Sequence, residues 1–261
     1  CLFRRHMLAQ GAWTNPSISE DIDFKLLLSD DFRERSGNAQ RNALRAFRDA
    51  VTEIWTAAGF AIIRCSPQDG YRFLDYEMSY PTILDTHGAL RPHILAQFSA
   101  KPPRLPVVRC GFGSFISQFE CNEFEVQDIA CIDPIETAAD KLSALSWRLP
   151  LRDRSHGNDD PAIVRHFHDL AALESIAEAS RDFPALLRTV LEDDRHRGKG
   201  ALADLSPQER LNAMLSALTN DPLYEGEYRR FVGGMAFAGE GDIPSFAESV
   251  AAVKRLCDRL E

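Results

Sequence analysis

The chain has 261 residues, enough for one large domain or two small ones. Its 44% apolar and 26% charged residues are typical of a globular protein, and neither a secretory signal nor a membrane-spanning apolar run is evident. The net charge of -9 gives no global reason to bind nucleic acid, and six cysteines without a C-x-x-C pair argue against a zinc ribbon and for free thiols in the cytoplasm.

The first half of the chain is predicted to consist mainly of strands. Residues 1–10 indicate a short basic helix, and residues 38–58 have helical periodicity through Leu44, Phe47, Val51, Ile54 and Trp55. Gly111 to Ser114 indicate a turn. The predicted strands cover residues 18–29, 60–65, 71–80, 93–100 and 124–132, the second and third forming a hairpin.

Helices are predicted for most of the second half. Asp133, Pro134 and Glu136 form a helix start, with an acidic N-cap, a first-turn proline and a glutamate three residues after the cap. The helices are expected at residues 133–147, 161–179, 183–192, 207–218, 223–235 and 244–260, with a flexible basic loop at 195–200. This order predicts an α+β protein with domains 1–132 and 133–261.

Asp21 and Asp23 lie at i and i+2 in the first predicted strand, so their side chains point to the same face. Two acids on one face are costly unless a cation or a proton neutralises them. Paired strand carboxylates commonly build a metal-dependent phosphoryl-transfer site. The alternative is a surface strand whose Ile22 and Phe24 face the core while the acids face water.

Lys141 borders an apolar helical stripe formed by Ala138, Leu142 and Leu145. Its head can reach water while its stem packs, or it can bind phosphate. In the segment 165–169, the spacing of the first and last residues predicts a surface ion pair on one helix face.

Further polar positions have open interpretations. Gln97 shares one face of its predicted strand with Leu95 and Ser99, which indicates a solvent-facing position. Two groups of basic side chains have two interpretations: they are solvated, or they form a local surface for tRNA. They are Arg148, Arg152 and Arg154, and the basic residues of the 195–199 segment.

In series, these segments resemble the AbiEii/AbiGii family of nucleotidyltransferase toxins of bacterial toxin–antitoxin and phage-defence systems. The resemblance covers nearly the whole chain. It is carried by residues 19–24 (S-E-D-I-D-F), 90–100 (L-R-P-H-I-L-A-Q-F-S-A), 136–145 (E-T-A-A-D-K-L-S-A-L), 165–170 (R-H-F-H-D-L), 221–228 (D-P-L-Y-E-G-E-Y) and 244–246 (P-S-F).

The resemblance implies a polymerase-β-like nucleotidyltransferase core with a mixed sheet, followed by a helical region. By the same resemblance, Asp21 and Asp23 hold Mg²⁺ with a nucleoside triphosphate, and Lys141 contacts the triphosphate or stabilises the transferring phosphoryl group. Asp169 orients that lysine or assists deprotonation of the acceptor. Such transfer depends mainly on positioning and charge neutralisation. Ser19 and Arg4 are the further nucleotide-binding residues, the acceptor is tRNA or another RNA, and the partner is a cognate antitoxin.

The sequence departs from the family pattern at two places. Relatives carry a Gly-Gly-Ser/Thr segment before the acidic strand, and residues 1–4 resemble the stretch directly after that segment. We therefore expect that this chain lacks the segment, through a mis-assigned start, a truncation or gene decay. A longer upstream reading frame that encodes it would settle the question. Gln97 stands where relatives have a third acid; its amide oxygen can still bind a metal but carries no charge. A degenerate relative that binds a nucleotide or an antitoxin without catalysis is the alternative.

Overall fold

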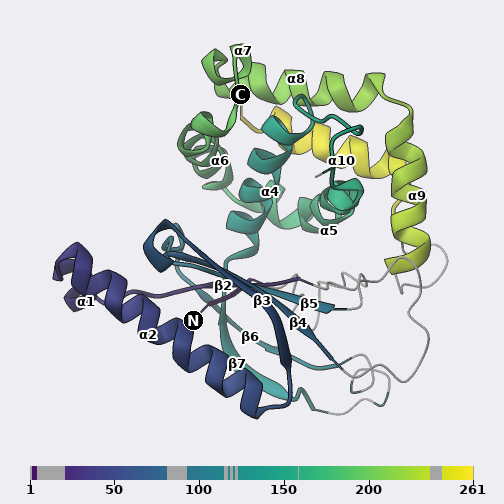
Figure 1. The fold of residues 1–261 in the computed structure, drawn as a ribbon. Coiled ribbons are helices and arrows are strands. Elements are labelled where there is room, and N and C mark those ends of the chain that lie inside the picture. Colours follow the sequence, from purple (N-terminus) through teal and green to yellow (C-terminus); the bar gives the residue numbers. More distant parts are fainter. Residues whose placement is uncertain are drawn as a thin grey trace. The chain divides into compact units, whose positions relative to one another are not determined.

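The computed structural model describes residues 2–4, 21–80, 93–114, 117, 120, 123–157, 159–235 and 243–260 (Figure 1). Two compact units divide these residues, the first containing those up to Ile132 and the second those from Asp133. Among the described residues, no helix combines the length and apolarity needed to cross a bilayer.

The first unit is built on a mixed sheet, which within the described residues has seven strands in the order β3-β4-β5-β2-β1-β7-β6 (Figure 1). Strands β2 and β5 are parallel, as are β1 and β7, and the other neighbours are antiparallel. The strands are β1 (Leu2–Arg4), β2 (Asp21–Lys25), β3 (Ala61–Gln68), β4 (Phe73–Ser79), β5 (His93–Ser99), β6 (Val108–Phe112) and β7 (Val126–Cys131).

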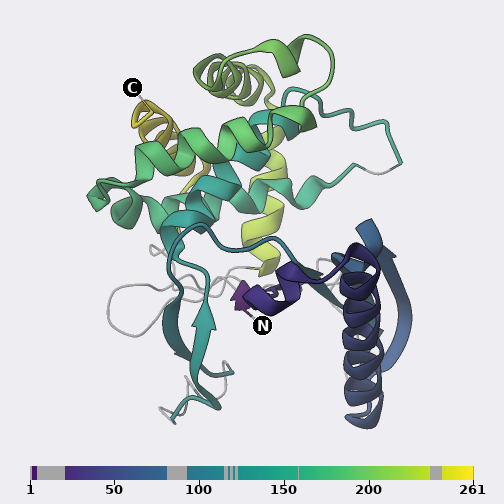
Figure 2. The ribbon, with the colours of Figure 1, turned by 90° about the vertical axis from the view of Figure 1, so that its left-hand side faces the viewer.

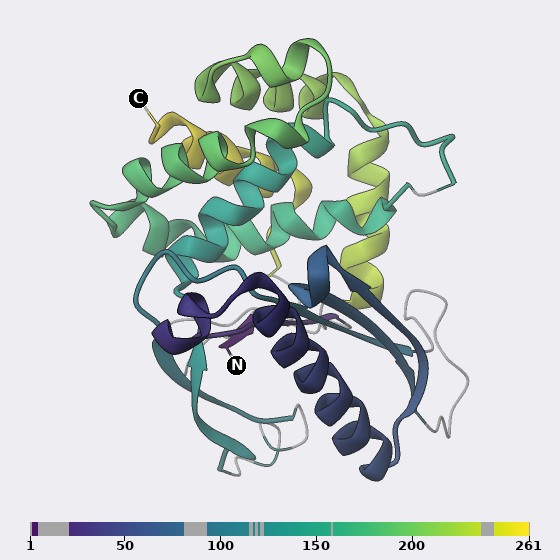
Figure 3. The ribbon, with the colours of Figure 1, turned by 60° about the vertical axis from the view of Figure 1, so that its left-hand side comes forward.

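Helix α2 (Gly37–Ala57) packs on the apolar face of this sheet (Figure 3). Ser36 caps the helix by accepting a hydrogen bond from the Ala39 amide, and the short helix α1 (Asp30–Glu34) precedes it. Periodicity places Ile54 on the apolar stripe, but its side chain is 64% exposed because it lies at the margin of that stripe.

Phe98 on β5 is the centre of the core between α2 and the sheet. Its ring stacks on Phe24 of β2 at 4.6 Å and meets the edge of Phe47 on α2 at 5.3 Å. Tyr76 of β4 is fully buried beside it and donates a hydrogen bond to the carbonyl of Arg48 at 2.9 Å. Since strand side chains alternate, the residues flanking these aromatics in sequence project to the opposite face of the sheet.

Some local predictions for the first unit are wrong. The basic helix predicted for residues 1–10 is contradicted at Leu2–Arg4, which form β1; one helical turn is costly to nucleate, and the sheet satisfies these backbone groups instead. The predicted turn at Gly111 is part of β6, a strand that periodicity did not reveal. A Cβ at Gly111 would lie 2.6 Å from the Phe124 ring, so the glycine makes room for that ring rather than for a turn.

The second unit is helical, as predicted (Figure 2). The carboxylate of Asp133 accepts a hydrogen bond from the Ile135 amide at 2.8 Å and thereby starts the first helix. The helices are α4 (Pro134–Arg148), α5 (Arg165–Ala179), α6 (Phe183–Asp193), α7 (Ala201–Asp204), α8 (Pro207–Asn220), α9 (Leu223–Met235) and α10 (Phe246–Asp258). Short 3-10 turns are η1 (Asp69–Tyr71) in the first unit and η2 (Pro161–Val164) and η3 (Arg195–Arg197) here. The turn η3 lies within the segment 195–200, which is expected from the sequence to be a flexible loop throughout.

Helix α5 is held by α4 on one side and by the C-terminal helices on another. Its Phe167 contacts the rings of Tyr224 at 6.0 Å and Phe246 at 6.2 Å. The Tyr228 hydroxyl donates a hydrogen bond to the carbonyl of Pro244 at 2.8 Å. The C-terminal segments 221–228 and 244–246 therefore support the helix that carries Asp169.

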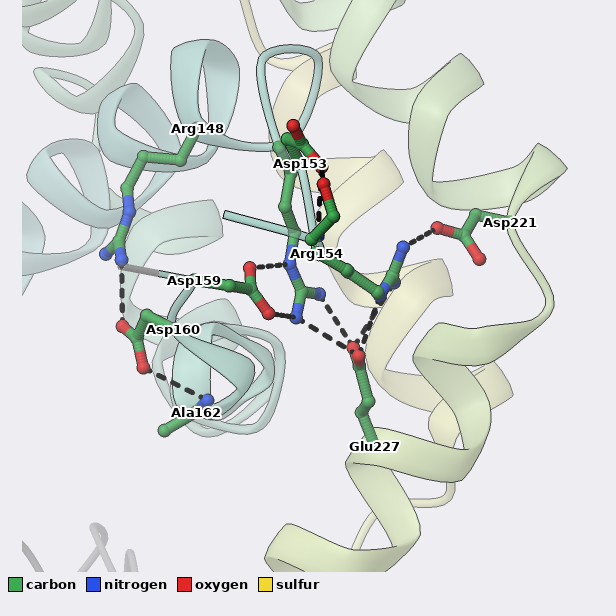
Figure 4. A network of polar contacts seen from close by, with 10 residues as sticks. Arg148, Asp153, Arg154, Asp159, Asp160, Ala162, Asp221 and Glu227 are labelled. Atoms are coloured by element: carbon green, nitrogen blue, oxygen red, sulfur yellow. Dashed lines mark hydrogen bonds and ion pairs between the residues drawn. The ribbon is translucent and has the colours of Figure 1, made fainter. Parts of the chain in front are cut away.

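A buried ion-pair network attaches the loop between α4 and α5 to helix α9 (Figure 4). Arg152 donates hydrogen bonds to Asp159 and to Glu227, each at 2.7 Å, and Arg154 donates to Glu227 at 2.8 Å and pairs with Asp221. Both guanidinium groups also lie over the Tyr224 ring. The side chains of Arg152 and Glu227 are only 5% and 6% exposed.

These contacts correct both readings of the loop arginines. Arg152 is buried and Arg154 is partly exposed, and carboxylates on their own unit engage both guanidinium groups. Arg148 likewise pairs with Asp160 at 2.8 Å (Figure 4). The loop sequence could not show this, because two of the acidic partners lie some 70 residues further along the chain, at Asp221 and Glu227.

Replacing Glu227 by glutamine should destabilise the protein by roughly 3 kcal/mol, because breaking a buried pair leaves uncompensated charge. Urea unfolding near neutral pH measures the loss. The matched control is Glu225→Gln on the same helix, whose exposed pair with Arg229 is worth less than about 0.5 kcal/mol. Equal effects of the two substitutions would show that the network does not hold the loop.

The same network predicts a loss of stability in acid. Hydrogen bonds from Arg152 lower the pKa of Asp159, and those from Arg154 and Arg152 outweigh burial and lower the pKa of Glu227. Carboxyls with lowered pKa values stabilise the fold above their unfolded pKa of about 4 and lose this contribution as the pH falls through the folded value. We expect the urea midpoint to fall between about pH 5 and pH 3, and to fall less steeply in Glu227→Gln; parallel curves would contradict this.

Candidate functional site

The sheet face opposite α2 carries a row of polar residues from three adjacent strands. Asp23 on β2 pairs in register with Gln97 on β5, and Gln97 pairs in turn with Asp75 on β4. Directly opposite residues in neighbouring strands project to the same face. Their sequence neighbours Phe24, Phe98 and Tyr76 form the core, so the row faces away from α2.

Asp21 and Arg4 are placed beside this row by their backbones. Asp21 lies two residues before Asp23 on β2 and pairs with Leu95, and Arg4 on β1 pairs with Asp23. Arg4 therefore lies on a strand and not on the helix predicted for it. Ser19 lies outside the described residues.

The amide group of Gln97 contacts Asp75. Its Nε2 donates a hydrogen bond to Oδ1 of Asp75 at 3.4 Å, while Oδ2 of Asp75 pairs with Nη2 of Arg64 at 3.0 Å. Arg64 also pairs with Glu77 at 3.4 Å. Asp75 first, and then Glu77, raise the pKa of Arg64.

The chemistry of this face suits a hard divalent cation. Asp23 supplies carboxylate oxygens and Gln97 supplies an amide oxygen, and Mg²⁺ prefers oxygen ligands from one or two carboxylates together with substrate phosphates. Among the side chains that the structure describes, no group of three His, Cys, Asp or Glu residues is placed to hold a metal ion. Asp23 and Gln97 are thus residues that could hold Mg²⁺ together with substrate phosphates.

A separate cluster lies inside the helical unit, where α4 packs on α5. Nζ of Lys141 lies 2.9 Å from Oδ2 of Asp169, and the two side chains are 7% and 3% exposed. The lysine head is therefore largely buried in an ion pair rather than solvated, which contradicts one of the two interpretations of this residue. Asp169 is likewise not the surface residue that the helix spacing predicted.

His166 extends this cluster. Its Nδ1 lies 3.3 Å from Nζ of Lys141. Burial and then the positive charge of Lys141 lower its pKa well below the usual value, so the ring is neutral near pH 7. Because an ammonium only donates, Nδ1 accepts and the ring proton is on Nε2. Lys141 is thus held between a carboxylate and a neutral imidazole.

The structure brings the predicted residues together within each unit. In the sheet, Asp21, Asp23 and Gln97 lie on adjacent strands, and in the helices Lys141 meets Asp169. Sequence reasoning missed Asp75. Alternation along β4 was its one available signal, but the strand that neighbours β5 could not be read from the sequence.

Comparison with known proteins agrees with these features. A model of the family described as nucleotidyl transferase AbiEii toxin, Type IV TA system, matches residues 15–252. Neither the curated proteins nor the solved structures contain a significant match. The matched region includes both the strand with the paired acids and the helices with Lys141 and Asp169, and a mixed sheet followed by helices is consistent with a nucleotidyltransferase fold. The chain therefore belongs to the AbiEii family of nucleotidyl transferase toxins of Type IV toxin–antitoxin systems.

Proposed function

We propose that this protein is a Mg²⁺-dependent toxin that transfers a nucleotide from a nucleoside triphosphate to RNA, with tRNA as the acceptor, in the cytoplasm. The family supplies the nucleotidyltransferase class and implies a triphosphate substrate and an antitoxin partner. The observation that supports Mg²⁺ dependence is the row of oxygen donors formed by Asp23 and Gln97 on the sheet face away from α2. The RNA acceptor is proposed from the family resemblance.

In this proposal, Asp21, Asp23 and Gln97 hold the metal. A bound Mg²⁺ would neutralise the charge of the triphosphate. Lys141 stabilises negative charge on the transferring phosphoryl group, and Asp169 fixes the position of its ammonium group from 2.9 Å. Neutral His166 accepts a hydrogen bond from the same ammonium group and adds no positive charge beside it.

The acceptor surface does not use the arginines of the loop before α5, because carboxylates engage them. In the 195–199 segment, Arg195, Arg197 and Lys199 are all exposed. Arg195 donates a hydrogen bond to the carbonyl of Ala203, and Arg197 pairs with Asp194. With a net charge of -9, RNA binding depends on local charge, so we expect it to weaken strongly as salt rises.

Asp23→Asn should abolish transfer of labelled nucleotide to tRNA by the protein, with a loss of at least about 100-fold, because the substitution removes charge at the metal. The matched control is Asp49→Asn on α2, an exposed acid paired with Arg48 on the helix that covers the apolar face. Full activity in Asp23→Asn would refute the proposed metal site.

Lys141 can be tested separately for stability and for activity. Lys141→Met should cost about 3–5 kcal/mol in urea unfolding, because it leaves Asp169 buried without a counter-charge. The double substitution Lys141→Met/Asp169→Leu should restore most of the stability, since it replaces the pair with apolar groups. If Lys141 acts on the triphosphate, the stable double variant still transfers no nucleotide. Recovery of transfer together with stability would assign the pair a structural role alone.

The second candidate function is binding of a nucleotide or the antitoxin without catalysis. Gln97 favours it, because this position contributes no charge to the metal site. Calorimetric titration with each triphosphate and Mg²⁺, beside the transfer assay, separates the two candidates. Binding without turnover supports the second candidate, and turnover excludes it.

A further inference from the structure

The side chain of Gln97 has two chemically different ends. Its carbonyl oxygen can bind a cation, whereas its NH₂ group is a donor and cannot. A glutamine in a metal site is therefore useful in only one of its two amide orientations. A carboxylate at this position has no such constraint, because both of its oxygens can bind a metal.

Asp75 selects between these orientations. Its carboxylate accepts hydrogen bonds and offers no donor, so the amide end that approaches Oδ1 at 3.4 Å is the NH₂ group. Because Gln97 lies in register between Asp75 on β4 and Asp23 on β2, the carbonyl oxygen is left for the side on which Asp23 lies.

Asp75 is itself held in place. Its Oδ2 pairs with Nη2 of Arg64 at 3.0 Å, which leaves Oδ1 for the amide of Gln97. The Asp75 side chain is 15% exposed, so neighbouring side chains restrict its rotamers. The Asp75 carboxylate thus accepts hydrogen bonds from two donors, Arg64 at Oδ2 and the Gln97 amide at Oδ1.

We propose that Asp75 is a positioning residue that orients the amide of Gln97, so that its oxygen and not its nitrogen faces the divalent cation held by Asp23. This inference rests on the proposed function, because it assumes that the cation binds at this face. It accounts for a working metal site at a position where a neutral amide replaces an acid.

The test is the affinity for Mn²⁺ alone, measured from the electron paramagnetic resonance signal of the free ion. Asp75→Asn should weaken Mn²⁺ binding about tenfold, since groups that orient metal ligands typically contribute this much. The matched control is Glu77→Gln, which removes the same charge from the same strand. Glu77 also pairs with Arg64, but it lies opposite Leu95 and not Gln97. We expect it to change Mn²⁺ affinity less than twofold. Thermal unfolding verifies that each variant is folded.

A second background separates orientation from charge. In Gln97→Glu, either carboxylate oxygen can bind the ion, so adding Asp75→Asn should no longer weaken Mn²⁺ binding. In that background, Asp75→Asn should also remove the repulsion between Asp75 and the glutamate at position 97, which lie directly opposite each other. An equal loss from Asp75→Asn in both backgrounds, or a loss no larger than that of Glu77→Gln, would overturn the inference.

Asp23→Asn distinguishes this failure from failure of the proposed function. If Asp23→Asn abolishes Mn²⁺ binding while Asp75→Asn behaves like Glu77→Gln, the metal site stands and the role of Asp75 is wrong. If wild-type protein shows no saturable Mn²⁺ binding, or Asp23→Asn binds as well as wild type, the metal site and this inference both fall.

Discussion

The candidate metal face depends on the packing of Phe98 against its aromatic neighbours. Phe98 stacks on Phe24 and contacts Phe47, which fixes the pairing of β2 with β5 and of β5 with β4 while one face is buried under α2. A slip of one residue would turn every side chain of a strand to the other face. The alignment of Asp23, Gln97 and Asp75 is therefore a consequence of the core on the opposite side. Strand geometry places these donors on a rigid support, which the proposed metal and triphosphate site would require.

In the helical unit, a buried ion pair and not strand register positions the ammonium group of Lys141. Lys141 and Asp169 are buried together, and desolvation makes such a pair costly to form but more costly to break. The C-terminal segments contribute indirectly, because Tyr224 and Phe246 pack on Phe167 of the same helix that carries Asp169. The arginine network attaches the loop before α5 to α9 and so limits movement of that helix start.

Local patterns predicted much of this architecture. The alternation of residues 21–25 and the helix start at Asp133 are short-range signals. The helix begins where expected, whereas β2 lies within the predicted strand 18–29 but ends at Lys25. Features that depend on distant partners were not predictable: the buried head of Lys141, the pairing of Arg152 with Glu227, and the position of Asp75 beside Gln97. Leu2–Arg4 have a helix-like composition but form a strand, because tertiary pairing with β2 outweighs weak local preference. The family resemblance supplied what spacing alone could not, namely which acids and which lysine to consider together.

We propose that the β2–β5 face binds a divalent cation through oxygen atoms. The most direct test is a crystal structure of the protein with Mn²⁺ and a non-hydrolysable nucleoside triphosphate, in which anomalous scattering locates the metal. We predict an anomalous peak within coordination distance of the Asp23 carboxylate and the Gln97 side-chain oxygen, with phosphate oxygens completing the shell. A peak elsewhere, or a bound triphosphate with no metal at Asp23, would contradict cation binding at this face.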